Sequence, residues 1–180
     1  MKRLRIAFDL DGVIVDKPPL IPKSLIEKWF RGTKEKTLNY RIPSSRFEIA
    51  VRKLSHFYLF RPPIKENLKA VADLSRSQRY RLYIISGRYS FLKNETRAWL
   101  ERRGINSYFH KIYLNSKNEQ PYLFKEKILK KIKAEWYVDD DNLIADYLAK
   151  NLKTKIYCFG KQKHACLEAK GINYLSDIRT

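Results

Sequence analysis

The sequence predicts an α/β fold, in which a Rossmann-like parallel sheet is flanked by helices and a small helical cap is inserted after the first strand. Short apolar runs alternate with segments of helical periodicity, which is the pattern of βαβ units. The chain has 180 residues, enough for one domain with a full core. One interval, residues 17–60, interrupts the alternation, and it is where we expect the insertion.

The expected strands are short and rich in β-branched and aromatic residues, and they lie at 4–9, 81–86, 111–115, 135–140 and 155–160. Amphipathic segments between and after them predict helices at 64–78, 91–103, 121–133, 142–151 and 161–170. Pro121 suits a first helical position, and Gly104 and Gly171 suit positions just after a helix. Residues 1–16 and 61–180 therefore form the expected core.

Residues 17–60 are expected to form two helices joined by a loop that contains proline and serine. The first apolar face is Leu25, Ile26, Trp29 and Phe30, and the second is Phe47, Ala50, Val51, Leu54 and Tyr58. Because these residues share helical faces, we expect most of the aromatic side chains to form the insertion's own core. Tyr40 and Arg41, in the loop, are weaker candidates for contact with a substrate.

The chain is strongly basic, with 38 Lys and Arg residues against 19 Asp and Glu. Such a charge favours anionic partners, namely phosphorylated small molecules, nucleotides or nucleic acid, although a lysine-rich solvated surface is an equal alternative. Cys158 and Cys166 match no zinc or redox spacing, and no apolar run approaches the ~18 residues of a membrane span. We therefore expect a cytoplasmic protein without a membrane partner. The sequence leaves the oligomeric state open.

Polar side chains follow the predicted strands. Asp9 ends the first, Ser86 and Gly87 end the second, Asn115 ends the third, and the acids 139–141 end the fourth. Because ligands bind at the carboxyl ends of parallel strands, we expect these groups to converge. Carboxylates without histidine favour Mg²⁺ over Zn²⁺. The alternative is that single acids cap a turn or helix, which explains two pairs of acids less well.

Four segments, in order, resemble the motifs of the haloacid dehalogenase-like (HAD) hydrolase superfamily. They are FDLDGV from Phe8, IISGR from Ile84, PYLFKEKILKK from Pro121 and WYVDDD from Trp136. A lone DxD would be weak evidence, but the ordered set is specific. The resemblance covers most of the chain outside residues 17–60. It is to the phosphatase type of the superfamily, and the basic, aromatic insertion resembles that of the nucleotidase branch.

The resemblance implies the roles of the site residues. Asp9 would be the nucleophile that forms an aspartyl-phosphate, and Asp11 would protonate the leaving oxygen and then activate water. Ser86 and the Gly87 backbone would bind the phosphoryl group, with Arg88 a further candidate that is more often a surface charge. Mg²⁺ would be held by Asp9, the Asp11 backbone carbonyl, Asp139 and Asp140. The presence of Asp11 favours phosphoester over carbon–halogen cleavage.

Two assignments stay open at this point. Lys125 shares a helical face with the apolar positions 128, 129 and 132 and is preferred as the motif lysine, with Lys127 as the alternative. Asp139 and Asp140 are preferred as the metal pair over pairs that include Asp141 or Asp146, since Asp141 suits a helix cap.

The expected function is that of a Mg²⁺-dependent phosphatase that hydrolyses a phosphomonoester, the substrate being a nucleotide or another small phosphorylated metabolite. One alternative is a phosphatase acting on a nucleic-acid end. The other is a nucleic-acid-binding protein on a HAD-like fold with vestigial catalysis. Retention of Asp9, Asp11, Ser86 and Lys125 argues against the latter.

Overall fold

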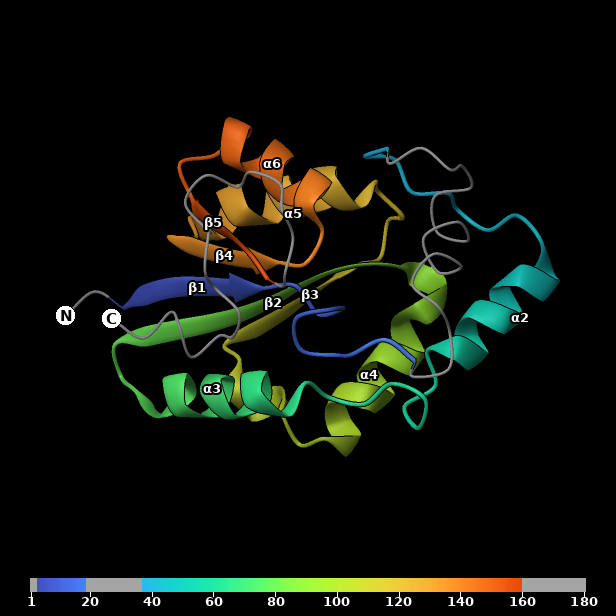
Figure 1. Ribbon diagram of the computed structural model, residues 1–180, viewed down its shortest axis with the longest axis horizontal. Helices are drawn as coiled ribbons and strands as arrows, with labels where there is room; N and C mark the ends of the chain where they lie inside the picture. The colour runs from blue at the N-terminus through green and yellow to red at the C-terminus, as the bar shows by residue number, and fades with distance from the viewer. Residues whose placement is uncertain (1–2, 19–36, 160–180) are drawn as a thin grey trace.

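The computed structural model describes residues 3–18 and 37–159, and all structural statements below concern these residues. Five strands form one sheet in the order β3-β2-β1-β4-β5, and every neighbouring pair is parallel (Figure 1). The strands are β1 (Leu4–Phe8), β2 (Tyr80–Tyr89), β3 (Lys111–Asn115), β4 (Trp136–Asp139) and β5 (Lys155–Cys158). The expected parallel α/β sheet is confirmed.

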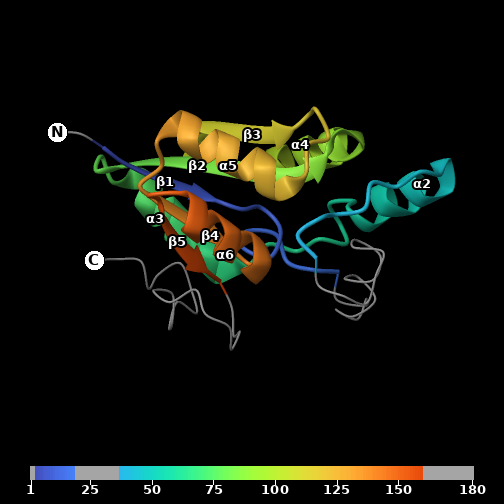
Figure 2. The same cartoon turned by 90° about the horizontal axis from the view of Figure 1, so that it is seen from above.

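Helices cover both faces of the sheet. α3 (Lys65–Arg76) and α4 (Lys93–Arg102) lie on one face, and α5 (Pro121–Ile132) and α6 (Asn142–Asn151) lie on the other (Figures 1 and 2). Short 3-10 turns at Ser90–Leu92 and Asn106–Tyr108 complete the connections. Four of the expected helices are thus found within a few residues of their predicted bounds, whereas the helix expected at 161–170 lies outside the described residues. No helix in the described ranges is long and apolar enough to cross a membrane.

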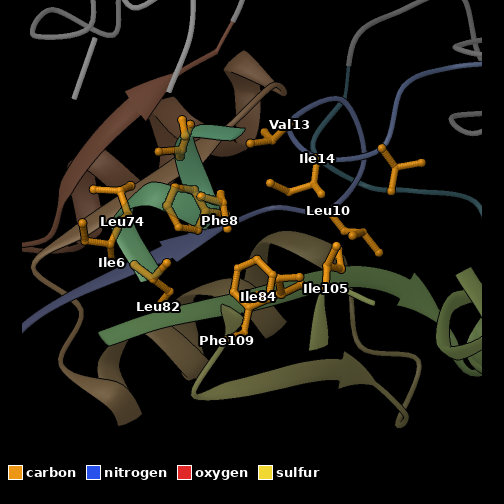
Figure 3. Close-up of a cluster of buried hydrophobic side chains, with 14 of the residues drawn as sticks. Ile6, Phe8, Leu10, Val13, Ile14, Leu74, Leu82, Ile84, Ile105 and Phe109 are labelled. Atoms are coloured by element: carbon orange, nitrogen blue, oxygen red, sulfur yellow. The ribbon is translucent and has the colours of Figure 1, made fainter. Parts of the chain in front are cut away.

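β1 is the central strand, since it pairs with β2 on one side and β4 on the other. Its side chains alternate between the two faces of the sheet, as a strand requires. Ile6 and Phe8 join the cluster under α3 and α4 (Figure 3), and Ala7 joins the cluster under α5 and α6. Burial on both faces holds β1 rigidly, so Asp9 is fixed at the middle of the sheet's carboxyl edge.

The turn that follows β1 is packed into the core. Leu10, Val13 and Ile14 are fully buried and join the cluster that Figure 3 shows. The backbone N–H groups of residues 14 and 15 donate to the Leu10 carbonyl at 3.0 and 2.8 Å. The carboxylate of Asp11 is therefore carried by a turn that is held by apolar packing and backbone hydrogen bonds.

The interval expected to hold two helices contains α2 (Arg46–Ser55), which begins at an N-cap where the Ser45 hydroxyl accepts from the Glu48 N–H at 3.1 Å. The other expected helix, which contains Leu25 and Trp29, lies outside the described residues. α2 extends beyond the carboxyl ends of the strands (Figures 1 and 2).

The apolar face of α2 differs from the expectation that it packs in the insertion's own core. Phe47 and Leu54 are 79% and 62% exposed. α2 projects past the sheet, and neither of the sheet's two core clusters includes these side chains.

The two chain segments that lead into and out of the interval lie side by side. The Asp16 N–H donates to the Pro62 carbonyl at 2.8 Å, and the Ile64 N–H donates to the Ile14 carbonyl at 2.9 Å. We call these paired segments, residues 14–16 and 62–64, the neck. The division into a core of 1–16 and 61–180 and a cap of 17–60 stays a prediction.

Candidate active site

Three carboxylates converge where the central strands end. Asp9 follows β1, Asp139 ends β4, and Asp140 comes next in the chain. One oxygen from each lies within 4.8 Å of the others. β1 and β4 are adjacent in the sheet, and the Asp9 N–H donates to the Val138 carbonyl at 2.8 Å, which sets these acids side by side. The predicted convergence of Asp9 with the terminal acids is therefore present.

Lys125 lies between two of these carboxylates. Its Nζ is 2.8 Å from Asp139 Oδ2 and 3.2 Å from Asp9 Oδ2, and the side chain is buried. Lys127 points to the surface, where its ammonium group is 2.9 Å from Glu119. Of the two candidates for the motif lysine, only Lys125 is in the site. Its place on the apolar face of α5, at the end nearest the strand termini, explains why.

Gly87 sets the position of α5. A Cβ at this residue would lie 2.9 Å from the Pro121 Cβ, which is too close for an ordinary contact. The glycine thus lets the first turn of α5 approach the end of β2, and Lys125 comes from the next turn. This packing role was not part of the prediction, which gave Gly87 a role in backbone approach to phosphate.

Asp139 is held from three sides. The Tyr137 hydroxyl and the Lys125 ammonium group both donate to Oδ2 at 2.8 Å, and the Asp141 N–H donates to Oδ1 at 3.0 Å. Tyr137 was not predicted as a site residue. Residues two apart on a strand share a face, so the spacing of Tyr137 and Asp139 was a usable signal.

Asp140 is partly exposed and lies against the backbone of Gly12. A Cβ on Gly12 would come within 2.0 Å of Asp140 Oδ2, and Gly12 has a φ of 71°, which favours glycine. The Lys17 ammonium group is 3.6 Å from the same oxygen. Gly12 is therefore a site residue that the prediction missed, although it stands inside the FDLDGV motif.

Asp141 is the N-cap of α6, as expected, and accepts from the N–H groups of Leu143 and Ile144 at 3.0 and 3.4 Å. Its other oxygen accepts from the Tyr40 hydroxyl. The preferred metal pair, Asp139 and Asp140, is thus the one that lies beside Asp9, whereas Asp141 caps α6.

Asp11 is surrounded by arginine. Arg88 donates to both of its carboxylate oxygens at 2.7 Å, and Arg61 donates to Oδ1. Both guanidinium groups are buried. The interpretation of Arg88 as a surface charge is therefore wrong, because Thr96 and Asp11 hold it in the interior. Arg61 was not predicted, since it lies far from Asp11 in the sequence and in no motif.

Ser86 is fully buried within β2, and its hydroxyl accepts from the Arg88 N–H at 3.4 Å. The prediction that this strand ends at Ser86 is wrong, because β2 continues to Tyr89. The Gly87 carbonyl accepts from Asn115 Nδ2 at 3.4 Å, which joins the ends of β2 and β3. The register of these two strands shifts between Ser86 and Tyr89. Such an irregularity is common where a strand end re-aims its side chains for a site.

Tyr40, which lies in the interval, forms hydrogen bonds with residues at the edge of the site. Its N–H donates to Gln120 at 2.9 Å, and its carbonyl accepts from the Tyr89 hydroxyl at 3.0 Å. Its own hydroxyl donates to Asp141. Tyr40, which was considered for substrate contact, is thus anchored beside the acids.

Burial and charge set the protonation of these groups. Burial raises the pKa of Asp9 well above its usual value, although Lys125 opposes this. Burial, reinforced by the charge of Asp139, raises the pKa of Asp140 to about 7. Burial acts in the same direction on Asp11, but Arg88 and Arg61 outweigh it and hold the pKa of that carboxyl well below its usual range. The carboxylates of Asp139 and Asp9 raise the pKa of Lys125, against the effect of burial.

The acids fit a hard divalent cation. Asp9, Asp139 and Asp140 supply oxygen ligands of the kind that Mg²⁺ prefers. Among the described residues, two ammonium groups, those of Lys125 and Lys17, lie beside these three carboxylates, so a bound cation would help to balance their charge. Burial is the main cause of the raised pKa values of Asp9 and Asp140, and the neighbouring carboxylates add to it. The Asp11 carboxylate lies outside this set, with the arginines, so only its backbone carbonyl remains as the predicted ligand.

No protein-family model matches the chain, and comparison with curated proteins gives no significant match. Solved structures do resemble it. A haloacid dehalogenase-like hydrolase from Streptococcus pneumoniae has a TM-score of 0.61 at 14% identity, with 98% of this chain and 96% of that chain covered. A protein described as a predicted phosphatase from Clostridium acetobutylicum has a TM-score of 0.60 at 14% identity, with 97% and 93% covered.

A third similar structure is a HAD-family enzyme from Bacteroides thetaiotaomicron, a variant with an aspartate replaced by alanine, in complex with magnesium and inorganic phosphate. Its TM-score is 0.56 at 13% identity, and the match covers 92% of this chain and 98% of that chain. At these identities the likeness concerns the fold, and it extends over nearly the whole length of each chain.

Proposed function

We propose that this chain, whose fold is that of the haloacid dehalogenase-like hydrolases, is a Mg²⁺-dependent phosphatase that cleaves a phosphomonoester through an aspartyl-phosphate. The observation that carries the proposal is the position of Asp9. Its carboxylate lies within reach of a buried lysine, Lys125, and of two acids that complete a cation site. A phosphatase of this kind needs a nucleophile, a cation site and a phosphate-binding lysine at one place.

In the first step, a carboxylate oxygen of Asp9 attacks the phosphorus atom and the bond from phosphorus to the leaving oxygen breaks. The Asp11 carboxyl donates a proton to that oxygen, so an alcohol departs. The Lys125 ammonium group neutralises charge on the phosphoryl oxygens, and the Ser86 hydroxyl donates to one of them. A bound Mg²⁺, held by Asp9, Asp139, Asp140 and the Asp11 carbonyl, would supply further charge neutralisation.

In the second step, water attacks phosphorus and the bond from phosphorus to the Asp9 oxygen breaks. Asp11, now a carboxylate, takes the proton of that water, and inorganic phosphate leaves. Atoms and charges balance over the two steps, because the proton given to the alcohol is returned by water.

The arginines that hold Asp11 as a carboxylate suit the second step directly. For the first step, Asp11 must carry a proton. A phosphate dianion that enters the site brings negative charge close to Asp11, which favours the protonated form and raises the pKa of the carboxyl. The bound substrate therefore shifts Asp11 toward the protonated form that the first step needs.

The substrate class that we favour is a small phosphorylated metabolite, with a nucleoside monophosphate as the leading case. The support is the excess of Lys and Arg, which attracts anions, together with the phenylalanines of the interval, which suit contact with a base.

A phosphorylated nucleic-acid end is a second candidate, and one observation favours it. Among the described residues, six of the seven large apolar side chains that are well exposed lie between residues 42 and 60, and they include Phe47, Phe57 and Phe60. Exposed aromatic side chains beside basic ones, here Arg46 and Lys53, suit the stacking and backbone contacts of single strands.

The experiment is a panel of phosphomonoesters with phosphate release as the readout: nucleoside monophosphates, sugar phosphates and oligonucleotides phosphorylated at either end. Each is tested with Mg²⁺ and with a chelator, with Asp9→Asn as the inactive control. We expect Mg²⁺-dependent release of phosphate by the wild type and no release by Asp9→Asn. Absence of release from every compound would refute it, and release from oligonucleotides alone would select the second candidate. Retention on nucleic acid without release, with a steep salt dependence, would instead indicate a binding protein.

A further inference from the structure

Two buried arginines meet at one carboxylate. Arg88 comes from β2 and donates to both oxygens of Asp11 at 2.7 Å, and Arg61 comes from the chain next to the neck and donates to Oδ1. The arginine residues are 8% and 5% exposed. Side chains from two distant parts of the sequence thus fix both oxygens of Asp11.

Each arginine is itself held in place. The third nitrogen of Arg88, Nη1, donates to the Thr96 hydroxyl at 3.0 Å, and that hydroxyl donates to the Leu92 carbonyl at 2.7 Å. The Arg61 carbonyl accepts from the indole N–H of Trp99, a fully buried residue of α4, at 2.6 Å. Arg61 also precedes Pro62, whose carbonyl pairs with Asp16 in the neck. The orientation of Asp11 is therefore determined by α4, β2 and the neck together.

Fold stability does not account for this arrangement. Two guanidinium groups are buried against one carboxylate, and among the described residues Arg61 Nε is buried with no hydrogen-bond partner. Burying charge costs free energy, and apolar side chains of similar size usually serve a core at least as well. Costly charged groups of this kind, gathered at one catalytic carboxylate, point to a functional role.

Resting on the proposed function, we propose that Arg61 and Arg88 are positioning residues that hold the Asp11 carboxyl group in one orientation, from which it transfers a proton to the leaving oxygen once the substrate phosphate has offset their charge. The proton transfer itself is made by Asp11. The arginines fix the position of the Asp11 carboxyl group, and a small displacement of a catalytic group lowers the reaction rate by a large factor. Arg61 is also adjacent in sequence to the neck, and the neck connects the interval to the core.

The leaving group provides the readout, because only poor leaving groups need the proton. p-Nitrophenolate departs readily without one, whereas the alkoxide of a nucleoside 5′-monophosphate does not. Arg61→Met and Arg88→Met are each assayed on both esters, with Arg61→Lys and Arg88→Lys as variants that keep the charge and lose the forked geometry. Arg52→Met is the matched control, because Arg52 is also a buried arginine, at 2% exposure, and pairs with Glu48.

We expect each methionine variant to lower kcat/KM for the nucleotide at least tenfold more than kcat/KM for p-nitrophenyl phosphate, with the lysine variants in between. Arg52→Met should change the two values by the same factor. An equal loss on both esters from the Arg61 and Arg88 variants, or no loss, would overturn this inference and leave the proposed function standing. A wild-type protein that releases phosphate from p-nitrophenyl phosphate and from no compound of the panel described above would refute this inference, and one that releases phosphate from none of these compounds would refute the proposed function as well. Thermal unfolding identifies any methionine variant that fails to fold. At such a position, kcat/KM of the lysine variant on the two esters is compared with that of the wild type instead.

Discussion

The Lys125 ammonium group donates to Asp139 Oδ2 at 2.8 Å and lies 3.2 Å from Asp9 Oδ2, so one buried cation connects the predicted nucleophile to the predicted metal ligands. All three side chains are buried. Loss of the lysine would leave two buried carboxylates without their cation, and this affects both the fold and the chemistry.

Lys125→Met should destabilise the protein by about 3–5 kcal/mol, the usual cost of removing one partner from a buried ion pair. Lys127→Met is the matched control on the same helix. Its ion pair with Glu119 is exposed, so it should cost at most about 1 kcal/mol. Urea unfolding measures both. Equal costs for the two variants would contradict the placement of Lys125.

Gly12→Ala should weaken binding of Mg²⁺ as well as the fold. An alanine Cβ would overlap the Asp140 carboxylate and also require a φ of 71°. Gly104→Ala separates the two effects, because Gly104 has a similar φ of 64° but no atom of the described part of the chain lies within 4 Å of the added carbon.

We expect Gly104→Ala to cost about 1–2 kcal/mol from backbone strain alone and to leave Mg²⁺ affinity unchanged. Gly12→Ala should cost more and should also reduce the affinity for Mg²⁺, measured by calorimetric titration. If Gly12→Ala bound Mg²⁺ as the wild type does, Asp140 would not be a ligand in the position described.

The metal-free protein should lose stability as the pH rises through about 7. The reason is that Asp140 has a pKa of about 7 in the folded state, above its ordinary value, so the folded protein holds a proton that the unfolded chain has released. This contribution is fully present below the unfolded pKa of about 4 and disappears above the folded pKa.

Asp140→Asn tests that assignment. The variant should lose the part of the pH dependence that lies between about pH 4 and 7 and should be more stable than the wild type at pH 8 when a chelator is present. Addition of Mg²⁺ should stabilise the wild type increasingly over the same range, because its ligands must be deprotonated, and should have little effect on the variant. Thermal unfolding at several pH values gives both results; identical profiles for the two proteins would rule out the role of Asp140.

Local patterns in the sequence account for the strands, most of the helices and the acids. β1, β3 and β4 are short, and Asp9, Asn115 and Asp139 lie at or just after their ends, which parallel pairing brings to one edge. β2 is longer than predicted and continues past Ser86 to Tyr89. The choice of Lys125 over Lys127 followed from helical phase, and Asp141 as a cap followed from its place before α6. Such features depend on neighbours within one or two turns, so the sequence displays them.

The contacts of Arg61 and Tyr40 could not be predicted in this way. Each lies in or beside the interval after β1 and meets the site only through tertiary packing: Arg61 with Asp11, and Tyr40 with Gln120 and Asp141. Nothing in the residues next to them indicates those partners. The burial of Arg88 is similar, since it depends on Asp11 and on Thr96 of α4. Long-range charge pairing of this kind is visible only in the folded chain.

The proposed mechanism requires Asp9 to accept the phosphoryl group. Its most direct test is to mix the protein with an excess of a ³²P-labelled phosphomonoester that it hydrolyses in the presence of Mg²⁺, to quench in acid within milliseconds, and to locate the label by mass spectrometry of peptides. We expect a label on Asp9 that hydroxylamine removes, as for an acyl phosphate, and no label on Asp9→Asn. A wild-type protein that releases phosphate without ever carrying label on Asp9, or an Asp9→Asn variant that releases phosphate at the wild-type rate, would show that Asp9 is not the nucleophile.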